Sequence, residues 1–238
     1  MYIELKTSSA FSFLEGASLP EELAREAARL EYPALALLDR DGVSGAPRFY
    51  KACREVGVHP LVGARISLKG GGELPLLVEN RKGYQNLCQL ITRMKLRAPK
   101  GKGAIDFDEI ESHSKGLVCL TGNLQGPVAK TIRRNGLRKA SRMLDRLKGI
   151  FGRQGVFVEI QRHFLRDQER LNQILISLSE RHGLALLASN GVLYADQKRR
   201  PLQDVLTCIR HKTTLREAGR VLASFALHEK AISTFGRV

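Results

Sequence analysis

Short apolar runs alternate with longer amphipathic stretches along the chain. The runs are rich in Leu, Val and Ile and span residues 34–38, 61–68, 73–79, 116–122, 155–160 and 183–189. Runs of this length and composition, bounded by turn-forming residues, predict β-strands. Strands that alternate with helices are typical of α/β proteins with a largely parallel sheet, either open or closed into a barrel. We therefore expect an α/β fold.

Three amphipathic stretches predict helices. They span residues 18–31, 81–96 and 167–182, and apolar residues recur in each of them at every third or fourth position. This repeat places the apolar side chains on one face of a helix, which we expect to be buried in the core. In the first stretch, Ser18 and Glu21 have the spacing of a capping box and Pro20 falls in the first turn, so Ser18 is the predicted cap.

Two segments have the composition of connections. Residues 97–107 combine basic residues, small residues and a proline, which predicts a loop or linker. Residues 70–72 are three glycines before a predicted strand; they lack the lysine and hydroxyl spacing of a phosphate loop and predict a hairpin turn. Asp106 and Asp108 have the spacing of paired polymerase acids, but we assign them to the start of a helix at 109–114, where acidic residues favour the macrodipole.

The chain carries a large excess of positive charge. Its 39 Lys and Arg residues against 24 Asp and Glu residues give a net charge of +15, which favours a polyanionic partner such as nucleic acid. Much of this excess lies around residue 97 and in a predicted helix at 130–148. The candidate nucleic-acid-binding residues are Lys95, Arg97, Lys100, Lys102, Arg133, Arg134, Arg138, Lys139 and Arg142. We expect phosphate contacts with little reading of bases, and a charged face exposed only to solvent is the competing interpretation.

The cysteines and the apolar runs also indicate where the protein works. Cys53, Cys88, Cys119 and Cys208 are scattered without paired spacing, which predicts buried, reduced thiols. The first residues do not form a signal peptide, and no run approaches the roughly 18 apolar residues of a membrane span. We expect a cytoplasmic protein that does not contact a membrane.

Five ordered blocks resemble a known family. They read ELKTSSAFSFLEGASLPEELAREA, ALALLDRDGVSGAPRFYKACREVGVHPLVGAR, LVENRKGYQNLCQLIT, FVEIQRH and LQDVLTCIRHKTTLREAG. In this order they resemble the N-terminal polymerase-and-histidinol-phosphatase (PHP) domain of bacterial DNA polymerase III alpha subunits, and the late blocks are most similar to the error-prone branch. The resemblance implies a distorted seven-stranded β/α barrel over residues 1–200. It also implies that residues 201–238 are the helical start of a connection toward a polymerase region that this chain lacks.

The resemblance identifies the positions at which family members bind metal. Such a site needs several neutral imidazoles and carboxylates that converge on one or more ions. The matching positions here are Lys6, Ser8, Glu15, Arg40, Arg65, Glu73, Asn123, Gly191 and Leu193. Glu15 and Glu73 keep a carboxylate, and two carboxylates do not build a multinuclear site. We therefore expect no metal cofactor and no catalytic residue.

Three of these positions are basic. Lys6, Arg40 and Arg65 carry positive charge where a metal ion would sit, and an arginine does not lose its charge. We expect them to pair with nearby carboxylates, namely Glu4, Glu15, Asp39 or Asp41. Ion pairs would then hold the site together in place of metal, since a buried charge without a partner is strongly destabilising.

These observations lead to one expected function and two alternatives. We expect a PHP domain of an error-prone polymerase III alpha-type protein that has lost its reaction and serves DNA replication or repair synthesis as a metal-free scaffold. Its partner would be the remainder of a polymerase, or another replication or repair subunit, covering an exposed apolar surface near residues 201–234. The first alternative is a phosphoesterase or 3′–5′ exonuclease that uses Mn, Zn or Mg, and the second is a free-standing nucleic-acid-binding module.

Overall fold

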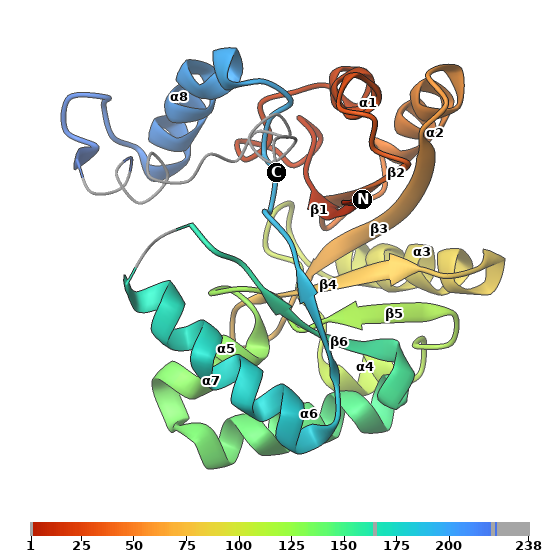
Figure 1. Cartoon of the computed structure of the whole chain (residues 1–238), viewed down its shortest axis with the longest axis vertical. Helices are drawn as coiled ribbons and strands as arrows, with labels where there is room; N and C mark the ends of the chain where they lie inside the picture. The colour runs from red at the N-terminus through yellow and green to blue at the C-terminus, as the bar shows by residue number, and fades with distance from the viewer. Residues whose placement is uncertain (1, 164–165, 220–221, 223–238) are drawn as a thin grey trace. The chain divides into compact units, whose positions relative to one another are not determined.

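The computed structural model describes residues 2–163, 166–219 and 222 (Figure 1). The strands within these residues are β1 (Glu4–Thr7), β2 (Ala34–Arg40), β3 (His59–Ser67), β4 (Glu73–Val78), β5 (Leu117–Leu120), β6 (Val156–Ile160) and β7 (Ala185–Ala188). The α-helices are α1 (Pro20–Arg29), α2 (Ala46–Glu55), α3 (Arg81–Leu96), α4 (Phe107–Glu111), α5 (Pro127–Asn135), α6 (Leu137–Phe151), α7 (Arg166–His182) and α8 (Arg200–His211). Each of the six apolar runs forms a strand at its predicted place, and β1 is an additional strand.

The strands follow one another through the sheet in sequence order, from β1 to β7. The pairs β1–β2, β5–β6 and β6–β7 are parallel, whereas β3–β4 and β4–β5 are antiparallel. The prediction of a largely parallel sheet is therefore wrong between β3 and β5. Gly70, Gly71 and Gly72 join β3 to β4 through the predicted hairpin turn, and strands joined so closely pair antiparallel. All three glycines have positive φ, from 83° to 105°, which favours glycine.

The helix bounds follow the apolar repeat closely. Helix α3 spans the predicted residues 81–96, and α7 begins one residue before its predicted start. The predicted cap of α1 is wrong. The helix begins at Pro20, and its capping contact is a hydrogen bond of 2.8 Å from the Leu19 N–H to the Glu22 carboxylate. The Ser18 hydroxyl instead accepts a hydrogen bond from the Ala195 N–H, because Ser18 lies one residue too early to reach the first turn.

Two further helix predictions need correction. The stretch predicted as one helix at 130–148 forms α5 and α6, which are separated by Gly136 with a φ of 79°. This backbone conformation ends α5 and is easy only for glycine. The helix predicted at 109–114 forms earlier, as α4, because Asp106 caps it by accepting a hydrogen bond of 3.0 Å from the Glu109 N–H.

The chain divides into two compact units. The first unit consists of Met1–Val62, His163–Leu165 and Asn190–Val238, and the second of Gly63–Arg162 and Arg166–Ser189. The start of the predicted connection forms helix α8. Residues 220–221 and 223–238 of that connection lie outside the described residues, so a domain boundary at residue 200 stays a prediction.

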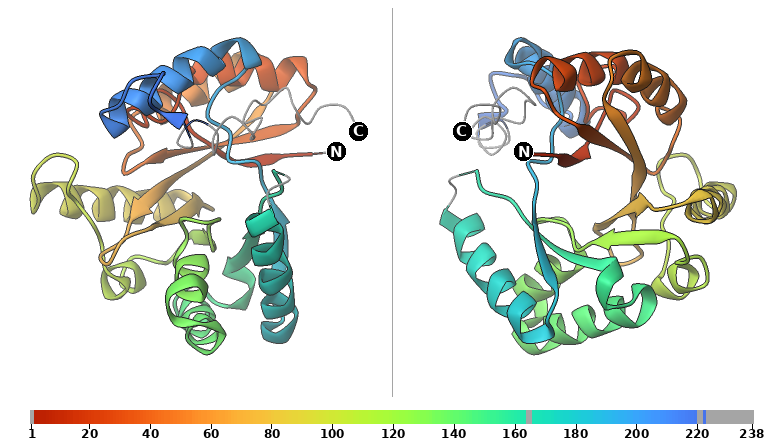
Figure 2. Two further views of the ribbon diagram at one scale, coloured as in Figure 1. Left: turned by 90° about the vertical axis from the view of Figure 1, so that its left-hand side faces the viewer. Right: turned by 45° about the vertical axis from the view of Figure 1, so that its right-hand side comes forward.

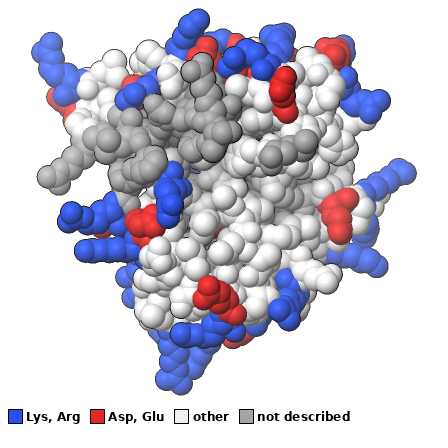
Figure 3. All heavy atoms as spheres, viewed as in Figure 1, with Lys and Arg blue, Asp and Glu red and all other residues white. Residues whose placement is uncertain are grey.

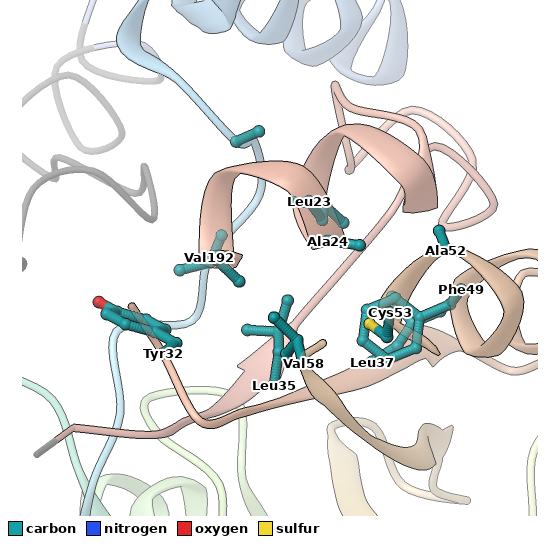
Figure 4. Packing of buried hydrophobic residues seen from close by; sticks show 12 residues of the cluster. Leu23, Ala24, Tyr32, Leu35, Leu37, Phe49, Ala52, Cys53, Val58 and Val192 are labelled. Carbon is teal, nitrogen blue, oxygen red and sulfur yellow. The ribbon is translucent and has the colours of Figure 1, made fainter. Parts of the chain in front are cut away.

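The core of the first unit lies between two helices and a strand. Helices α1 and α2 lie side by side over β1 and β2 (Figures 1 and 2). Leu23 and Phe49, from the two helices, and Leu35 and Leu37 of β2 are buried in one cluster with Cys53 (Figure 4). All residues of β2 except its last are buried, as expected for a strand that reads as an unbroken apolar run.

The second unit buries the apolar faces of its long helices. Helix α3 packs on β4 and β5, and helices α6 and α7 pack on β5, β6 and β7. The buried helical side chains include Leu87, Leu90, Met94, Leu144, Leu147, Leu171, Leu175 and Leu178. Three of the four cysteines are buried free thiols, as predicted, and Cys88 is half-buried. None of the helices in the described residues is long and apolar enough to cross a membrane.

Candidate functional site

In the first unit, the sequence positions that match family metal ligands gather where β1 and β2 end. The two strands are parallel, so their carboxyl ends lie at the same edge of the sheet. Lys6 is buried within β1, Ser8 follows that strand, and Arg40 is the last residue of β2. The fold thus places these three residues at one edge of the sheet.

The Asp39 carboxylate is held by three hydrogen bonds at this edge. It accepts hydrogen bonds from the Ser9 N–H at 2.8 Å, the Ser9 hydroxyl at 2.8 Å and the Ser12 hydroxyl at 2.7 Å. Asp39 is buried, and the Ser12 hydroxyl in turn accepts from the Arg40 N–H. Several donors of this kind satisfy a buried carboxylate without a cation. Ser9 and Ser12 are hydrogen-bond partners of Asp39 that sequence reasoning missed.

Glu4 is satisfied in a similar way. The buried carboxylate accepts hydrogen bonds from the Tyr2 hydroxyl at 2.6 Å, the Lys6 N–H at 2.8 Å and the Asn190 N–H at 2.9 Å. These contacts connect β1 with the segment that contains Gly191 and Leu193. The hydrogen bonds of Glu4 therefore tie β1 to the segment after β7.

Glu15 keeps a carboxylate at a ligand position and is paired with arginine. Arg40 donates a hydrogen bond of 2.8 Å to Glu15 and also lies 3.7 Å from the carboxylate of Asp41. Arg210 of α8 approaches the same Glu15 oxygen at 3.5 Å. Arg40 and Glu15 thus form one of the ion pairs that the sequence predicts. The contact from Arg210 was not predicted, because the apolar repeat of α8 gives no sign that an arginine at its last turn reaches Glu15.

The remaining positions of the first unit that the resemblance matches to metal ligands are occupied by a serine, a glycine and a leucine. Ser8 donates a hydrogen bond from its N–H to the Val192 carbonyl and one of 3.3 Å from its hydroxyl to the Leu38 carbonyl. Leu193 is buried beside Ala17 and Tyr194 in a small apolar cluster. Gly191, with a φ of 63°, offers no side chain at all.

In the second unit, two ligand positions pair with each other. Arg65 of β3 donates from Nη1 to both carboxylate oxygens of Glu73, at 2.9 and 3.1 Å. Both side chains are largely buried, with 9% and 13% of their surface exposed. The sequence predicts an ion pair for Arg65 but with other carboxylates, and the antiparallel register that places Ser67 opposite Glu73 explains the observed partner.

Asn123 belongs to a buried hydrogen-bond network of the second unit. Its amide donates a hydrogen bond of 2.7 Å to the Gln161 side chain. The Gln161 amide in turn donates a hydrogen bond of 2.8 Å to the Glu159 carboxylate. The Ser189 hydroxyl donates a further hydrogen bond of 2.6 Å to Glu159, which is fully buried. Burial raises the pKa of the neighbouring Cys119 thiol, and the Glu159 carboxylate raises it further, so this cysteine stays protonated. Glu159 and Gln161 of the EIQRH block belong to this network, which sequence reasoning did not foresee.

These side chains do not fit a metal centre. A hydrolytic site needs several imidazoles, thiolates or carboxylates around an ion. Within the described residues, no group of three or more His, Cys, Asp or Glu side chains is placed to hold one. Glu15 and Glu73, the carboxylates at ligand positions, are each engaged by an arginine, and Asn123 is engaged by Gln161.

The candidate nucleic-acid-binding residues fall into two different environments. Arg97 donates hydrogen bonds to the Glu109 carboxylate and the Ala104 carbonyl, so it fixes the loop before α4. Its neighbours Lys95, Lys100 and Lys102 are exposed. The side chains of the second group are exposed and make no hydrogen bond or ion pair with any described residue; the group consists of Arg133, Arg134, Arg138, Lys139 and Arg142.

The sequence is similar to known proteins over nearly its whole length. The PHP domain profile matches residues 4–163, which is more than half of the chain. Error-prone DNA polymerases from Mycolicibacterium paratuberculosis and Symbiobacterium thermophilum are 36% and 34% identical to it. The alignments cover 93% and 90% of this chain but 21% of each polymerase, so the chain spans about a fifth of the length of these relatives.

Solved structures share the fold at low sequence identity. An amidohydrolase from Chromobacterium violaceum, with bound sulfate and no metal, has a TM-score of 0.56 and 15% identity over 82% of this chain and 88% of that one. A protein from Bifidobacterium adolescentis assigned as a metal-dependent phosphoesterase has a TM-score of 0.52 and 15% identity over 79% and 86%. This likeness concerns the fold alone and confirms the predicted α/β class of PHP type. The chain belongs to the PHP domain family, and its sequence is similar to that of error-prone DNA polymerases.

Proposed function

We propose that the chain is a metal-free, catalytically inactive PHP domain that acts as a structural scaffold for an error-prone DNA polymerase in replication or repair synthesis. The observation that carries this proposal is the pairing of arginines with the carboxylates that remain at ligand positions, Arg40 with Glu15 and Arg65 with Glu73. A permanent guanidinium charge repels a divalent cation, and its carboxylate partner cannot coordinate metal without losing that ion pair.

The replaced positions still contribute to the fold. A bound metal cross-links the loops that supply its ligands, and the ion pairs and hydrogen bonds of this chain cross-link the same loops. Arg65 and Glu73 join β3 to β4, Asn123 joins the segment after β5 to Gln161 after β6, and Glu15 is contacted from α8. The positions have therefore kept a structural role after losing their metal donors.

We propose that the partner is the remainder of a polymerase, and that both work in the cytoplasm on DNA. Relatives about five times as long support this partner, because the aligned region is only 21% of their length. The described part of residues 201–234 includes Leu202, Val205 and Ile209, which are 41%, 39% and 55% exposed on α8. An exposed apolar stripe of this kind supports a protein contact on α8.

The decisive experiment is a calorimetric titration of the chelator-treated protein with Mn²⁺ and Zn²⁺. We expect no metal binding tighter than millimolar, and no release of phosphate from phosphoesters in the presence of either metal ion. A matched variant that restores the family donors, Lys6→His with Ser8→His and Arg40→His, should gain metal affinity if the fold has kept the geometry. Tight binding of two or more ions by the unaltered protein would overturn the proposal in favour of a metal-dependent phosphoesterase.

A second candidate function is direct contact with nucleic acid. Segment 127–151 carries eight basic residues and one acidic residue, Asp145. Asp145 is itself paired with Lys148 at 2.8 Å. A surface with this much uncompensated charge supports binding to a polyanion. Salt-dependent binding of DNA by the isolated chain, without any polymerase present, would separate this candidate from a purely structural role.

A further inference from the structure

Five basic side chains surround the break between α5 and α6. We call this surface the α5–α6 corner; it consists of Arg133, Arg134, Arg138, Lys139 and Arg142. The last turn of α5 supplies two of them and the first turns of α6 supply three. All five are exposed and make no ion pair with any residue in the described part of the chain. Figure 3 shows Lys and Arg side chains projecting at the lower edge, where Figure 1 places these helices.

The corner places cations where they weaken the helix that holds them. The amino end of a helix carries a partial positive charge from its unpaired N–H groups, so acidic residues are favoured in its first turn and basic residues are not. The first turn of α6 contains no acidic residue and includes Arg138 and Lys139. Arg138 and Arg142 are also four residues apart on one helix face, a spacing at which like charges repel. An arrangement that opposes local stability indicates a ligand that supplies negative charge.

The corner differs from the basic segment around residue 97 in the pairing of its charges with acidic residues. Around residue 97, Arg97 is held by Glu109, and Lys69 is held by Asp106 at 2.8 Å. At the far end of α6, Arg146 is held by Asp108 at 2.6 Å and stacks over the ring of Phe107. Acidic residues therefore offset part of the positive charge in both places. The corner keeps its five cations available.

We infer that the α5–α6 corner is a phosphate-binding surface for nucleic acid, which deepens the second candidate function and rests on it. Four of the five side chains are arginines, whose planar guanidinium groups bind phosphate through two parallel hydrogen bonds. Leu137 is the single exposed large apolar side chain among the described residues of α5 and α6, so the corner lacks the apolar centre of a protein interface. Regularly spaced phosphates match such a surface, and the binding should not depend on base sequence.

The experiment compares two triple variants of equal charge. Arg134→Gln/Arg138→Gln/Arg142→Gln removes three charges from the corner, and Lys51→Gln/Arg54→Gln/Lys82→Gln removes three exposed charges elsewhere. Fluorescence anisotropy with a labelled DNA duplex is recorded for each protein between 50 and 200 mM salt, and circular dichroism verifies the fold. We expect the corner variant to lose at least tenfold in affinity and the control about twofold or less. The slope of log K against log salt should fall by about 2.7 for three lost phosphate contacts.

Each other outcome overturns the inference in a recognisable way. If both variants lose affinity equally, the chain binds through its overall charge and the corner is not a site. If the unaltered chain does not bind DNA at low salt, the second candidate function fails with it. If polyglutamate displaces the duplex at an equal concentration of charge, the corner binds acidic proteins as readily as phosphate and the assignment to nucleic acid fails.

Discussion

Arg65 donates two hydrogen bonds from one guanidinium nitrogen to both carboxylate oxygens of Glu73. The resemblance to the PHP family predicts that both positions match metal ligands, and here the two side chains bind each other inside the second unit. Under the proposed function, the Arg65 guanidinium takes the place of a metal cation beside the Glu73 carboxylate. This exchange explains how a ligand position can become basic without leaving a buried carboxylate unpaired.

Breaking this pair from one side should be strongly destabilising. Arg65→Ala leaves the Glu73 carboxylate largely buried without its cation, and we expect the free energy of unfolding to fall by about 3–5 kcal/mol. Denaturant unfolding followed by circular dichroism measures this change. The double variant Arg65→Met/Glu73→Leu removes both charges and should recover most of the loss. A double variant as unstable as Arg65→Ala would show that packing, not the unpaired charge, determines the cost.

Neutralising Glu15 should loosen α8 while changing overall stability little. Arg40 is 48% exposed, so its ion pair with Glu15 is expected to contribute no more than about 1 kcal/mol. Glu15→Gln also weakens the attraction to Arg210, and we expect faster amide hydrogen exchange in α8. Asp41→Asn is the matched control, because it neutralises a carboxylate that lies 3.7 Å from Arg40 and leaves in place the Glu15 carboxylate that Arg210 approaches. Equal exchange in both variants would contradict a link through Glu15.

The contact between Arg97 and Glu109 predicts a defined pH dependence. The Arg97 guanidinium holds the pKa of the Glu109 carboxyl below its ordinary value of 4.5. A lowered carboxyl pKa stabilises the folded protein above pH 4.5, and this stabilisation is lost as the pH falls through the folded-state pKa. We therefore expect unaltered protein and Glu109→Gln to differ in stability at pH 6 and to converge below pH 4.5.

Thermal unfolding between pH 3 and pH 7 measures this convergence. Glu111→Gln is the control, because Glu111 lies in the same helix and its side chain makes no ion pair within the described residues. The Glu111 variant should stay close to the unaltered protein throughout. A difference between Glu109→Gln and the unaltered protein that persists unchanged at pH 3 would contradict the role assigned to Arg97.

The apolar repeat predicts most of the fold but little of the site. Helix α3 has the predicted bounds because the apolar repeat begins and ends at the same residues as the helix. Strand β1 escapes this reasoning, since three of its four residues are buried polar side chains and form no apolar run. The capping-box spacing predicts Ser18 as the cap of α1, but the cap is Leu19, one residue later.

The site depends on neighbours that are distant in sequence. The contacts of Asp39 with Ser9 and Ser12 span about thirty residues, and the contact between Glu15 and Arg210 spans most of the chain. Side-chain chemistry alone indicates that such charges need partners, as it did for Arg40. The identity of each partner follows from strand register and helix packing, which no local pattern contains.

Reversing one charge in the α5–α6 corner should raise the stability of the protein and lower its affinity for DNA. Arg138→Glu places an acidic residue in the first turn of α6, and we expect it to stabilise the protein by about 0.3–1 kcal/mol while lowering its affinity for duplex DNA. Arg93→Glu is the matched control: it makes the same charge change in the last turn of α3, where a cation is favourable, so it should destabilise the protein. Unfolding midpoints and anisotropy titrations on both variants test the two effects together. A corner variant that loses stability and keeps its affinity would mean that Arg138 supports α6 and does not serve a ligand.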